Sequence, residues 1–187
     1  MSAWELPTSL SVGGVPYEIR SDFRAVLDII AACSDPELTD EWKTRVMIKI
    51  LYPQWESIPR QDIPEAAQRA VEFIDAGISD DGKKPRLMDW EQDASVLIPA
   101  INHVAGHEVR SLPYLHWWTF LGYYMEIGDS TFSQILAIRR KKLKGKKLEK
   151  WENEFYRDNK KIIDLKKKET RAEGEKEAIR ALFGIRK

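Results

Sequence analysis

Two histidines, His103 and His107, are the residues best placed for metal chemistry, because they stand four positions apart. On an uninterrupted helix this spacing puts both imidazoles on one face, as in many zinc sites. Valine follows the first histidine where a zinc-protease motif has glutamate, and Gly106 can break the helix before the second. A third ligand, Glu108 or His116, would require a tertiary arrangement. A metal-dependent hydrolase is thus an alternative to ordinary surface or core histidines.

Three carboxylates, Asp89, Glu91 and Asp93, are close enough in sequence to act as a pair in acid–base catalysis. Carboxylates in the first turn of a helix are more commonly stabilised by the helix dipole. The sole cysteine, Cys33, follows two alanines at a predicted helix end and has no histidine near it in sequence, so we interpret it as inert. We therefore expect neither enzymatic activity nor a cofactor.

A basic run begins at residue 139. Residues 139–150 hold eight basic side chains and one acidic one, a pattern that can bind phosphates. Such runs beside apolar stripes are more often solvated helix faces, and the aromatics at positions 151, 155 and 156 fit helical packing better than base stacking. Nucleic-acid binding through residues 139–150 is a further alternative function. The candidate basic patch consists of Arg139, Arg140, Lys141, Lys142, Lys144, Lys146 and Lys147.

Charge is divided unevenly along the chain. Its 187 residues carry 30 basic and 30 acidic side chains, but residues 1–138 hold 11 basic and 21 acidic ones, against 19 and 9 in residues 139–187. An acidic body with a basic tail favours self-docking, association into an oligomer, or an acidic partner. Because the chain has one cysteine and the first seven residues lack the features of a signal peptide, we expect a cytoplasmic protein.

Apolar spacing predicts a mainly α-helical fold preceded by a small β-hairpin. Two short β-type runs flank Gly13-Gly14, a dipeptide that accepts the positive φ angles of a two-residue turn. Beyond them, apolar residues recur at helical steps. We expect a hairpin (1–20), an acidic helical body (21–138) and a basic helical tail (139–187) whose end is frayed.

Capping residues and helix breakers give the expected helix limits. The loop between the two halves of the body is predicted at residues 78–86, after a helix that ends at Gly77. The expected starts are Asp22 with Ser21 as cap, Thr39 as cap, Pro64 in a first turn, Asp89, Leu112, and Asp129 or Ser130 as cap.

Two segments have patterns that indicate packing or binding. Residues 112–127 are apolar almost all the way round, so this helix must be central or covered by a partner. It is too short and too polar in places for a membrane span. A second stripe resembles a short coiled coil and is expected to dock onto the body or another helix. It comprises Leu148, Trp151, Phe155, Ile162 and Leu165.

Several blocks together resemble a known family. They are Leu115-His-Trp-Trp-Thr-Phe120, Gly128-Asp-Ser-Thr-Phe-Ser-Gln-Ile-Leu-Ala-Ile-Arg-Arg140 and Gly145-Lys-Lys-Leu-Glu-Lys-Trp151. The glycine hairpin followed by Ser21-Asp-Phe-Arg24 adds to the likeness. The chain resembles the bacteriophage gene-product-fifteen family, encoded in tail modules of phages and prophages of Gram-positive bacteria.

The resemblance implies a tail-assembly chaperone that acts in the host cytoplasm and binds the long, helical tape-measure protein or a tail-tube protein. It brings no catalytic residues. Aromatic side chains dominate binding hot spots, although those of residues 117–124 are better explained as core. The candidate partner-binding residues are Trp117, Trp118, Phe120, Tyr123, Tyr124, Trp151 and Phe155.

Overall fold

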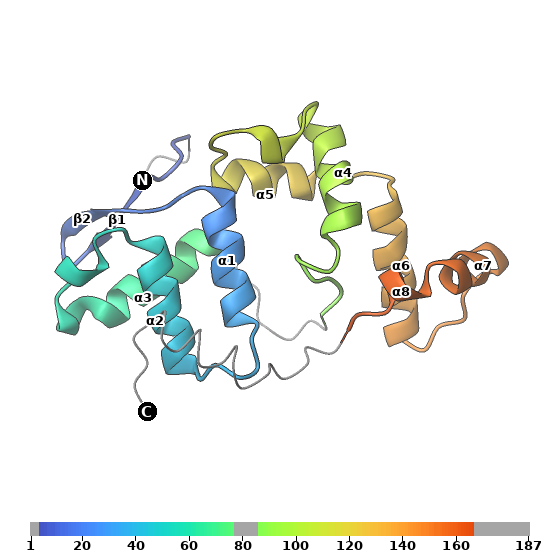
Figure 1. Cartoon of the computed structure of the whole chain (residues 1–187), viewed down its shortest axis with the longest axis horizontal. Coiled ribbons are helices and arrows are strands. Elements are labelled where there is room, and N and C mark those ends of the chain that lie inside the picture. The colour runs from blue at the N-terminus through green and yellow to red at the C-terminus, as the bar shows by residue number, and fades with distance from the viewer. Residues whose placement is uncertain (1–3, 77–85, 167–187) are drawn as a thin grey trace.

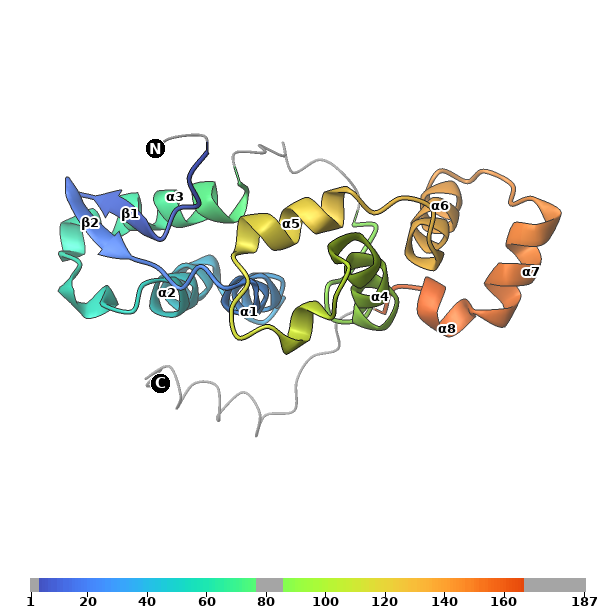
Figure 2. The same cartoon turned by 90° about the horizontal axis from the view of Figure 1, so that it is seen from above.

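A computed structural model describes residues 4–76 and 86–166 of the chain. These residues form eight α-helices, three short 3₁₀ helices and a two-stranded antiparallel sheet. The molecule is elongated, with the sheet at one end and the last helices at the other (Figures 1 and 2). The predicted fold class, mainly α-helical with a small N-terminal hairpin, is confirmed.

The hairpin pairs β1 (Ser9–Val12) with β2 (Val15–Glu18) around a two-residue turn. Gly13 and Gly14 have φ angles of +57° and +79°, values that residues with a Cβ rarely adopt. A Cβ at Gly13 would also lie 2.9 Å from the Asp62 carboxylate. Both backbone angle and close approach therefore require glycine at the first turn position.

The first helix, α1 (Phe23–Cys33), begins one residue later than its predicted start, Asp22. Asp22 is the cap, because its carboxylate accepts a hydrogen bond from the Arg24 backbone N–H over 3.0 Å. Ser21 was the wrong choice. Its hydroxyl is hydrogen-bonded to the Tyr114 hydroxyl instead.

Helices α2 (Asp40–Leu51) and α3 (Ile63–Ile74) are joined by two 3₁₀ helices, η1 (Trp55–Ser57) and η2 (Arg60–Asp62). Thr39 caps α2 and Pro64 lies in the first turn of α3, both as predicted. The predicted helix end at Gly77 and the predicted loop up to residue 85 lie outside the described residues.

Helices α4 (Ala94–Ala105) and α5 (Trp117–Met125) both start later than predicted. Residues 90–93 form a turn before α4, and Gly106 ends α4 in the left-handed conformation. Between the helices lies the 3₁₀ helix η3 (Val109–Ser111), followed by an extended stretch containing Pro113. Because a proline disfavours helical angles in the residue before it, α5 cannot extend back to residue 112.

The last three helices are α6 (Thr131–Leu143), α7 (Lys150–Asp158) and α8 (Lys160–Ile163). Ser130 caps α6 in a reciprocal capping box, as one of the two predicted caps. The helix runs unbroken across residues 138 and 139, where we placed the start of the basic tail. The chain then turns between α7 and α8 at Asn159, one residue beyond Asp158, the polar residue that interrupts the apolar stripe in the sequence.

Buried apolar side chains form two clusters of unequal size. The main cluster joins the hairpin to α1, α2, α3, α4, α5 and the start of α6. The second contains three isoleucines of α6 and α8, covered by partly buried residues that include Phe155. None of the described helices is long and apolar enough to cross a membrane.

Candidate functional site

Two consecutive tryptophans of α5, Trp117 and Trp118, donate hydrogen bonds to backbone carbonyls at the carboxyl end of α3. Trp117 Nε1 donates to the Ile74 carbonyl, and Trp118 Nε1 donates to the Phe73 carbonyl, each over 2.8 Å. The last carbonyls of a helix lack partners within that helix, so the two indoles replace water there. The pair therefore has a structural role that links two helices distant in sequence.

Burial separates the candidate aromatics of α5 into two groups. Trp117 and Phe120 are 2% and 0% exposed, and the Phe120 ring stacks on Phe23 with centroids 4.4 Å apart. These two residues belong to the core and are not available to a partner. The half-buried members, which pack against the main cluster, are Trp118, Tyr123 and Tyr124.

Residues 21–24 are hydrogen-bonded to the segment that leads into α5. The Phe23 N–H donates to the Leu115 carbonyl over 2.9 Å, and the Trp117 N–H donates to the Ser21 carbonyl over 2.8 Å. Two of the blocks that carried the family resemblance therefore form one joint between the start of α1 and the start of α5. The residue pattern of these two blocks therefore reflects a structural contact within the fold.

His116 is buried and both of its ring nitrogens are hydrogen-bonded. Nδ1 accepts from the Trp118 N–H and caps α5, while Nε2 lies 3.0 Å from the Pro7 carbonyl. A carbonyl can only accept, so the proton is on Nε2 and the ring is the neutral tautomer. Neither nitrogen is available for a metal.

The two remaining histidines are exposed and separated by the break at Gly106. His103 lies in α4, whereas His107 follows the helix and its ring meets Tyr123 edge-on at 6.4 Å. Among residues 4–76 and 86–166, no three histidine, cysteine or acidic side chains converge as a metal-binding group. The described part of the chain therefore offers no support for a metal-dependent hydrolase.

Cys33 is half-buried at the end of α1. Burial raises the pKa of its thiol, and the nearby charge of Lys43 only partly offsets this effect. A raised pKa lowers the fraction of thiolate, which is the nucleophilic form. The environment of Cys33 agrees with the inert interpretation.

Arg139 and Asp93 form a buried ion pair between α6 and the turn before α4. Their side chains are 5% and 0% exposed, and the guanidinium binds the carboxylate in bidentate fashion with two 2.7 Å hydrogen bonds. Paired, parallel hydrogen bonds of this kind are the strong form of the arginine–carboxylate interaction. Arg139 is therefore an interior residue and lies outside any surface basic patch.

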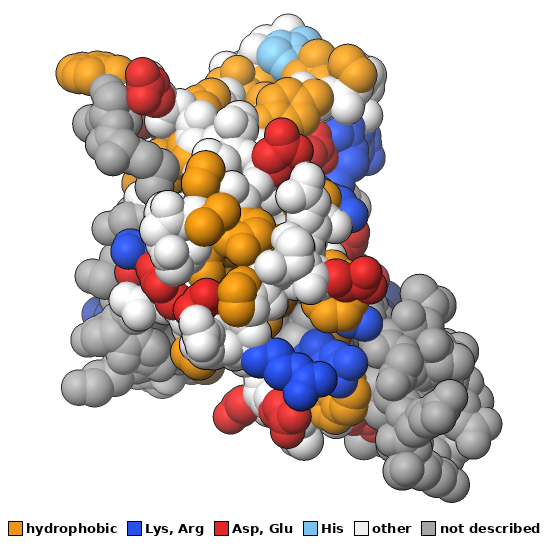
Figure 3. Space-filling view, turned by 90° about the vertical axis from the view of Figure 1, so that its left-hand side faces the viewer, with side chains coloured by type: hydrophobic (Ala, Val, Ile, Leu, Met, Phe, Trp, Pro, Cys, Tyr) orange, Lys and Arg blue, Asp and Glu red, His pale blue; other side chains and the backbone are white. Residues whose placement is uncertain are grey.

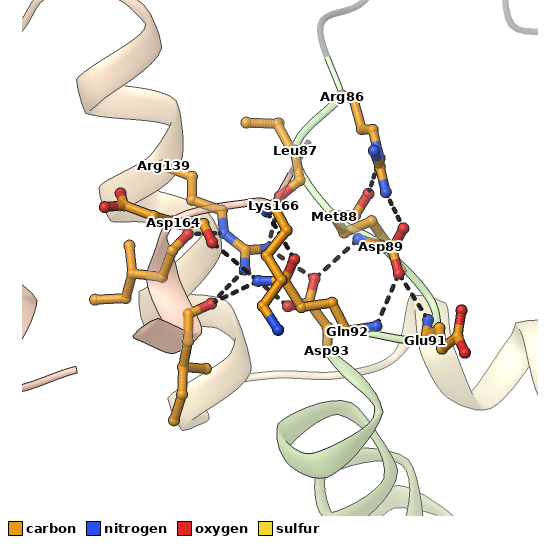
Figure 4. A network of polar contacts seen from close by, with 12 residues as sticks. Arg86, Leu87, Met88, Asp89, Glu91, Gln92, Asp93, Arg139, Asp164 and Lys166 are labelled. Carbon is orange, nitrogen blue, oxygen red and sulfur yellow. Dashed lines mark hydrogen bonds and ion pairs between the residues drawn. The ribbon is translucent and has the colours of Figure 1, made fainter. Parts of the chain in front are cut away.

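The other N–H groups of Arg139 bind backbone carbonyls (Figure 4). Nε donates to Ile163 over 2.6 Å, Nη2 to Ile162 over 2.7 Å and Nη1 to Leu87 over 2.9 Å. All five N–H groups are satisfied, and two of the carbonyls belong to the last residues of α8. One side chain thus joins α6, α8 and the segment before α4.

The neighbouring carboxylate, Asp89, supports the turn that holds Asp93 in place. Its Oδ1 accepts from the backbone N–H groups of Glu91 and Gln92, and its other oxygen pairs with Arg86 (Figure 4). Both aspartates are hydrogen-bonded within the protein, and neither is a free acid–base group. Two of the three predicted carboxylates, those of Asp89 and Asp93, hold this turn, whereas Glu91 contributes its backbone N–H.

Two further members of the predicted basic patch are paired within the protein. Lys141 Nζ lies 2.7 Å from Glu152, and Lys142 Nζ lies 2.6 Å from Asp164. The hydrogen bond from Lys141 lowers the pKa of the Glu152 carboxyl. Lys142 also lies 3.7 Å from the centroid of the Tyr156 ring, a cation–π contact. These pairs hold α7 and α8 against α6.

Four basic residues of the predicted patch remain on the surface, at the end of α6 and in the turn after it. They have no ion-pair partner among the residues that the structure describes. Because they lie within eight positions of one another, their charges together produce a positive electrostatic potential over this surface. These exposed residues are Arg140, Lys144, Lys146 and Lys147.

Apolar surface lies within the same stretch of chain. Leu143 is 57% exposed at the end of α6, and Trp151 is 49% exposed in the first turn of α7. Phe155, the other candidate in α7, is half-buried against the second cluster. We call residues 140–151 the α6–α7 turn surface. It combines the four basic residues that have no ion-pair partner in the described part of the chain with exposed leucine and tryptophan.

Sequence reasoning missed the ion pair, although one signal pointed to it. Arg139 continues the spacing of the buried residues Phe132 and Ile135, at steps of three and four along α6. A basic residue at a core-facing position is buried only when it is paired. That position predicts a buried acidic partner, but it does not identify Asp93.

The structure is that of a small α-helical protein with an N-terminal hairpin, and its α6–α7 turn surface is exposed. A profile of the family described as Bacteriophage Gp15 protein matches residues 4–165. The chain belongs to this family, whose membership indicates a phage structural or morphogenesis protein. No curated protein and no solved structure matches the chain.

Proposed function

We propose that this protein is a tail-assembly chaperone that binds the tape-measure protein, or another tail protein, in the host cytoplasm during virion morphogenesis. It acts by binding alone, without catalysis or a cofactor. The observation that supports this proposal is the α6–α7 turn surface, where cationic side chains without an ion-pair partner among residues 4–76 and 86–166 stand beside exposed Leu143 and Trp151.

This surface has the composition expected for binding an acidic amphipathic helix. Trp151 and Leu143 provide apolar contact area, and tryptophan is among the residues that dominate binding energies. The surrounding positive charge steers an acidic partner and raises the association rate. A long helical protein that must stay soluble before assembly presents such helices repeatedly. The same chaperone surface can therefore recognise each of them.

Co-expression with the cognate tape-measure or tail-tube protein tests the proposal. We expect a stoichiometric complex on a sizing column, and we expect the double variant Lys146→Glu, Lys147→Glu to weaken it at least tenfold. The matched control is Arg60→Glu, Lys161→Glu, which changes the net charge equally at exposed positions elsewhere. Separate elution of the wild-type proteins would count against the chaperone function.

The four exposed basic residues also favour a second candidate function, phosphate-backbone binding. Because three of the seven residues of the predicted patch are paired internally, the patch itself offers four charges to phosphates. The logarithm of the affinity for duplex DNA would then fall with the logarithm of salt concentration with a slope of roughly −3.6. Fluorescence anisotropy on a 20-base-pair duplex measures this slope, and no binding at low salt would eliminate the function.

A further inference from the structure

A groove of about 490 Å³ lies at the opposite end of the molecule, between β1 and the carboxyl-terminal half of α3. Ser9 and Ser11 of β1 line one wall, Arg69 and Phe73 of α3 line the other, and Trp118 borders it. Figure 3 looks at this end, where hydrophobic side chains gather in the middle of the face and acidic side chains stand on both sides. The groove is far from the α6–α7 turn surface (Figure 1).

The pairing register shows that β1 directs backbone groups away from β2. Val12 and Val15 flank the two-residue turn and form a hydrogen-bonded pair, so Ser11 and Pro16, the next pair along, are not hydrogen-bonded to each other. Proline has no N–H, which fits this position. The N–H and C=O of Ser11, and by the same alternation those of Ser9, therefore point outward from the hairpin.

The outward groups of β1 form an open strand edge on one wall of the groove. In the described parts of the chain, no hydrogen bond to the backbone N–H or C=O of Ser9 or Ser11 occurs on this side. A row of unpaired backbone groups is a template for one more strand. Any segment that binds here can therefore pair with β1 through its own backbone.

The remaining walls of the groove are apolar or electrically neutral. The rings of Phe73 and Trp118 stack with centroids 6.0 Å apart, and both residues line the groove. Its two charged residues, Arg69 and Glu72, pair with each other over 3.0 Å. Phe73 itself is buried, so Trp118 is the aromatic ring that a bound segment can reach. A charged segment would gain little here, whereas an uncharged segment can place an apolar side chain against Trp118.

The end of the groove near the hairpin turn is closed. The Gly13 N–H donates to a Glu65 carboxylate oxygen over 3.0 Å, so α3 is fastened to the turn. A bound strand is thereby limited to the stretch beside Ser9 and Ser11, which allows up to four backbone hydrogen bonds. This length corresponds to a short linear segment of a partner.

We infer that the groove binds a short, extended, uncharged segment of a partner tail protein as a third strand on β1. The backbone of the segment pairs with Ser9 and Ser11, and an apolar side chain of the segment rests on Trp118, which is half-buried. The identity of the partner rests on the proposed function, but the mode of binding does not. This surface takes an extended segment, whereas the α6–α7 turn surface takes an acidic helix.

Overlapping 12-residue peptides that tile the cognate tape-measure and tail-tube proteins provide the probe, with fluorescence anisotropy on the full chain as the readout. We expect the binding peptides to be uncharged, with apolar residues at alternate positions. Ser11→Pro removes an outward N–H without breaking a hairpin hydrogen bond, and we expect it to weaken peptide binding about tenfold.

The matched control is Glu18→Pro, which removes an outward N–H from β2, on the other edge of the hairpin. We expect this variant to bind within about twofold of wild type. Circular dichroism confirms that both variants fold. Equal binding by wild type and Ser11→Pro, binding only of charged peptides, or binding of none would overturn the inference.

Failure of the inference and failure of the proposed function are distinguishable. If Ser11→Pro binds peptides normally while the intact tail protein still co-elutes, the chaperone function stands and the strand mode is wrong. If peptides bind as expected but the intact protein does not co-elute, the strand mode stands without the chaperone function. A concentration-dependent dimer that Ser11→Pro abolishes would instead identify a second copy as the occupant, which contradicts the inferred partner.

Discussion

The body (residues 4–76 and 86–125) and the C-terminal unit (residues 131–166) are held together by different forces. The body is built around a large apolar cluster with stacked aromatic rings. In the C-terminal unit, the separate cluster contains three fully buried isoleucines, and ion pairs join its helices to one another and to the body. The burial of apolar side chains stabilises a packed structure but does not depend on direction. Bidentate and charge-assisted hydrogen bonds, by contrast, fix the orientation of the two groups that they join. The unit that carries the proposed binding surface is thus anchored in the main cluster by Phe132 and given its orientation by directional polar bonds.

The largest effect should come from the body. Phe120→Ala removes a fully buried ring that stacks on Phe23, and we expect the free energy of unfolding to fall by about 3–5 kcal/mol. Urea denaturation measures the change. Met125→Ala, at an exposed position of the same helix, is the control and should stay within about 0.5 kcal/mol of wild type. A small effect of Phe120→Ala would contradict the view that burial dominates the body.

The next effect should be confined to the C-terminal unit. Arg139→Met leaves Asp93 buried without its partner, and we expect a cost of about 3 kcal/mol, the lower end for breaking a buried pair. Asp93 keeps one donor, the Asp89 N–H. Hydrogen exchange should show lost protection in residues 150–163 and retained protection in α1. Equal loss in both would show that the two regions unfold as one.

A smaller effect tests the joint between α5 and α3. Trp118→Phe keeps an aromatic ring but removes the N–H that binds the Phe73 carbonyl, and we expect a loss of about 1 kcal/mol. Thermal unfolding followed by near-ultraviolet circular dichroism measures it. Tyr123→Phe, in the same helix, is the control. No difference between the two variants would mean that water replaces the indole at no cost.

The smallest expected effect is on the stability of the folded protein at acidic pH. Lys141 lowers the pKa of Glu152 below its ordinary value of 4.5, so this pair stabilises the folded protein above that pH. The contribution is lost as the pH falls below 4.5 and through the lowered pKa. Because Lys141 is partly exposed and screened by solvent, we expect only a slight loss of α7 protection in hydrogen exchange. In Glu152→Gln this part of the pH dependence should be absent.

Local signals in the sequence predicted the elements whose causes are local. The Gly13-Gly14 turn, the Thr39 cap and the break at Gly106 depend on a few neighbouring residues, and all three are present in the structure. The predicted start of α5 was wrong for two reasons. Hydrogen bonds to residues 21–24 keep the preceding stretch out of the helix, and Pro113 disfavours helical angles in the residue before it. Residues 21–24 are distant in sequence, so periodicity alone could not reveal them, whereas Pro113 is a local signal that the prediction of a start at Leu112 did not use.

The candidate site was predictable to a similar degree. Exposure of the lysines at 144, 146 and 147 follows from their position in a polar turn. Trp151 belongs to the stripe that was expected to dock, yet it is 49% exposed. The burial of Arg139, by contrast, depends on Asp93, which lies 46 positions earlier and resembles any carboxylate near a helix start. The open edge of β1 was also missed, because edge exposure depends on where α3 lies relative to the hairpin.

The arginine bridge also constrains the order in which the protein matures on the ribosome. Arg139 is synthesised 24 positions before Ile163, whose carbonyl it binds. At about 5–20 residues per second, its side chain waits roughly 1–5 s for that partner to be made, and longer for it to leave the exit tunnel. The body can form during that interval, whereas the surface around Trp151 reaches its final orientation only after α8 has emerged.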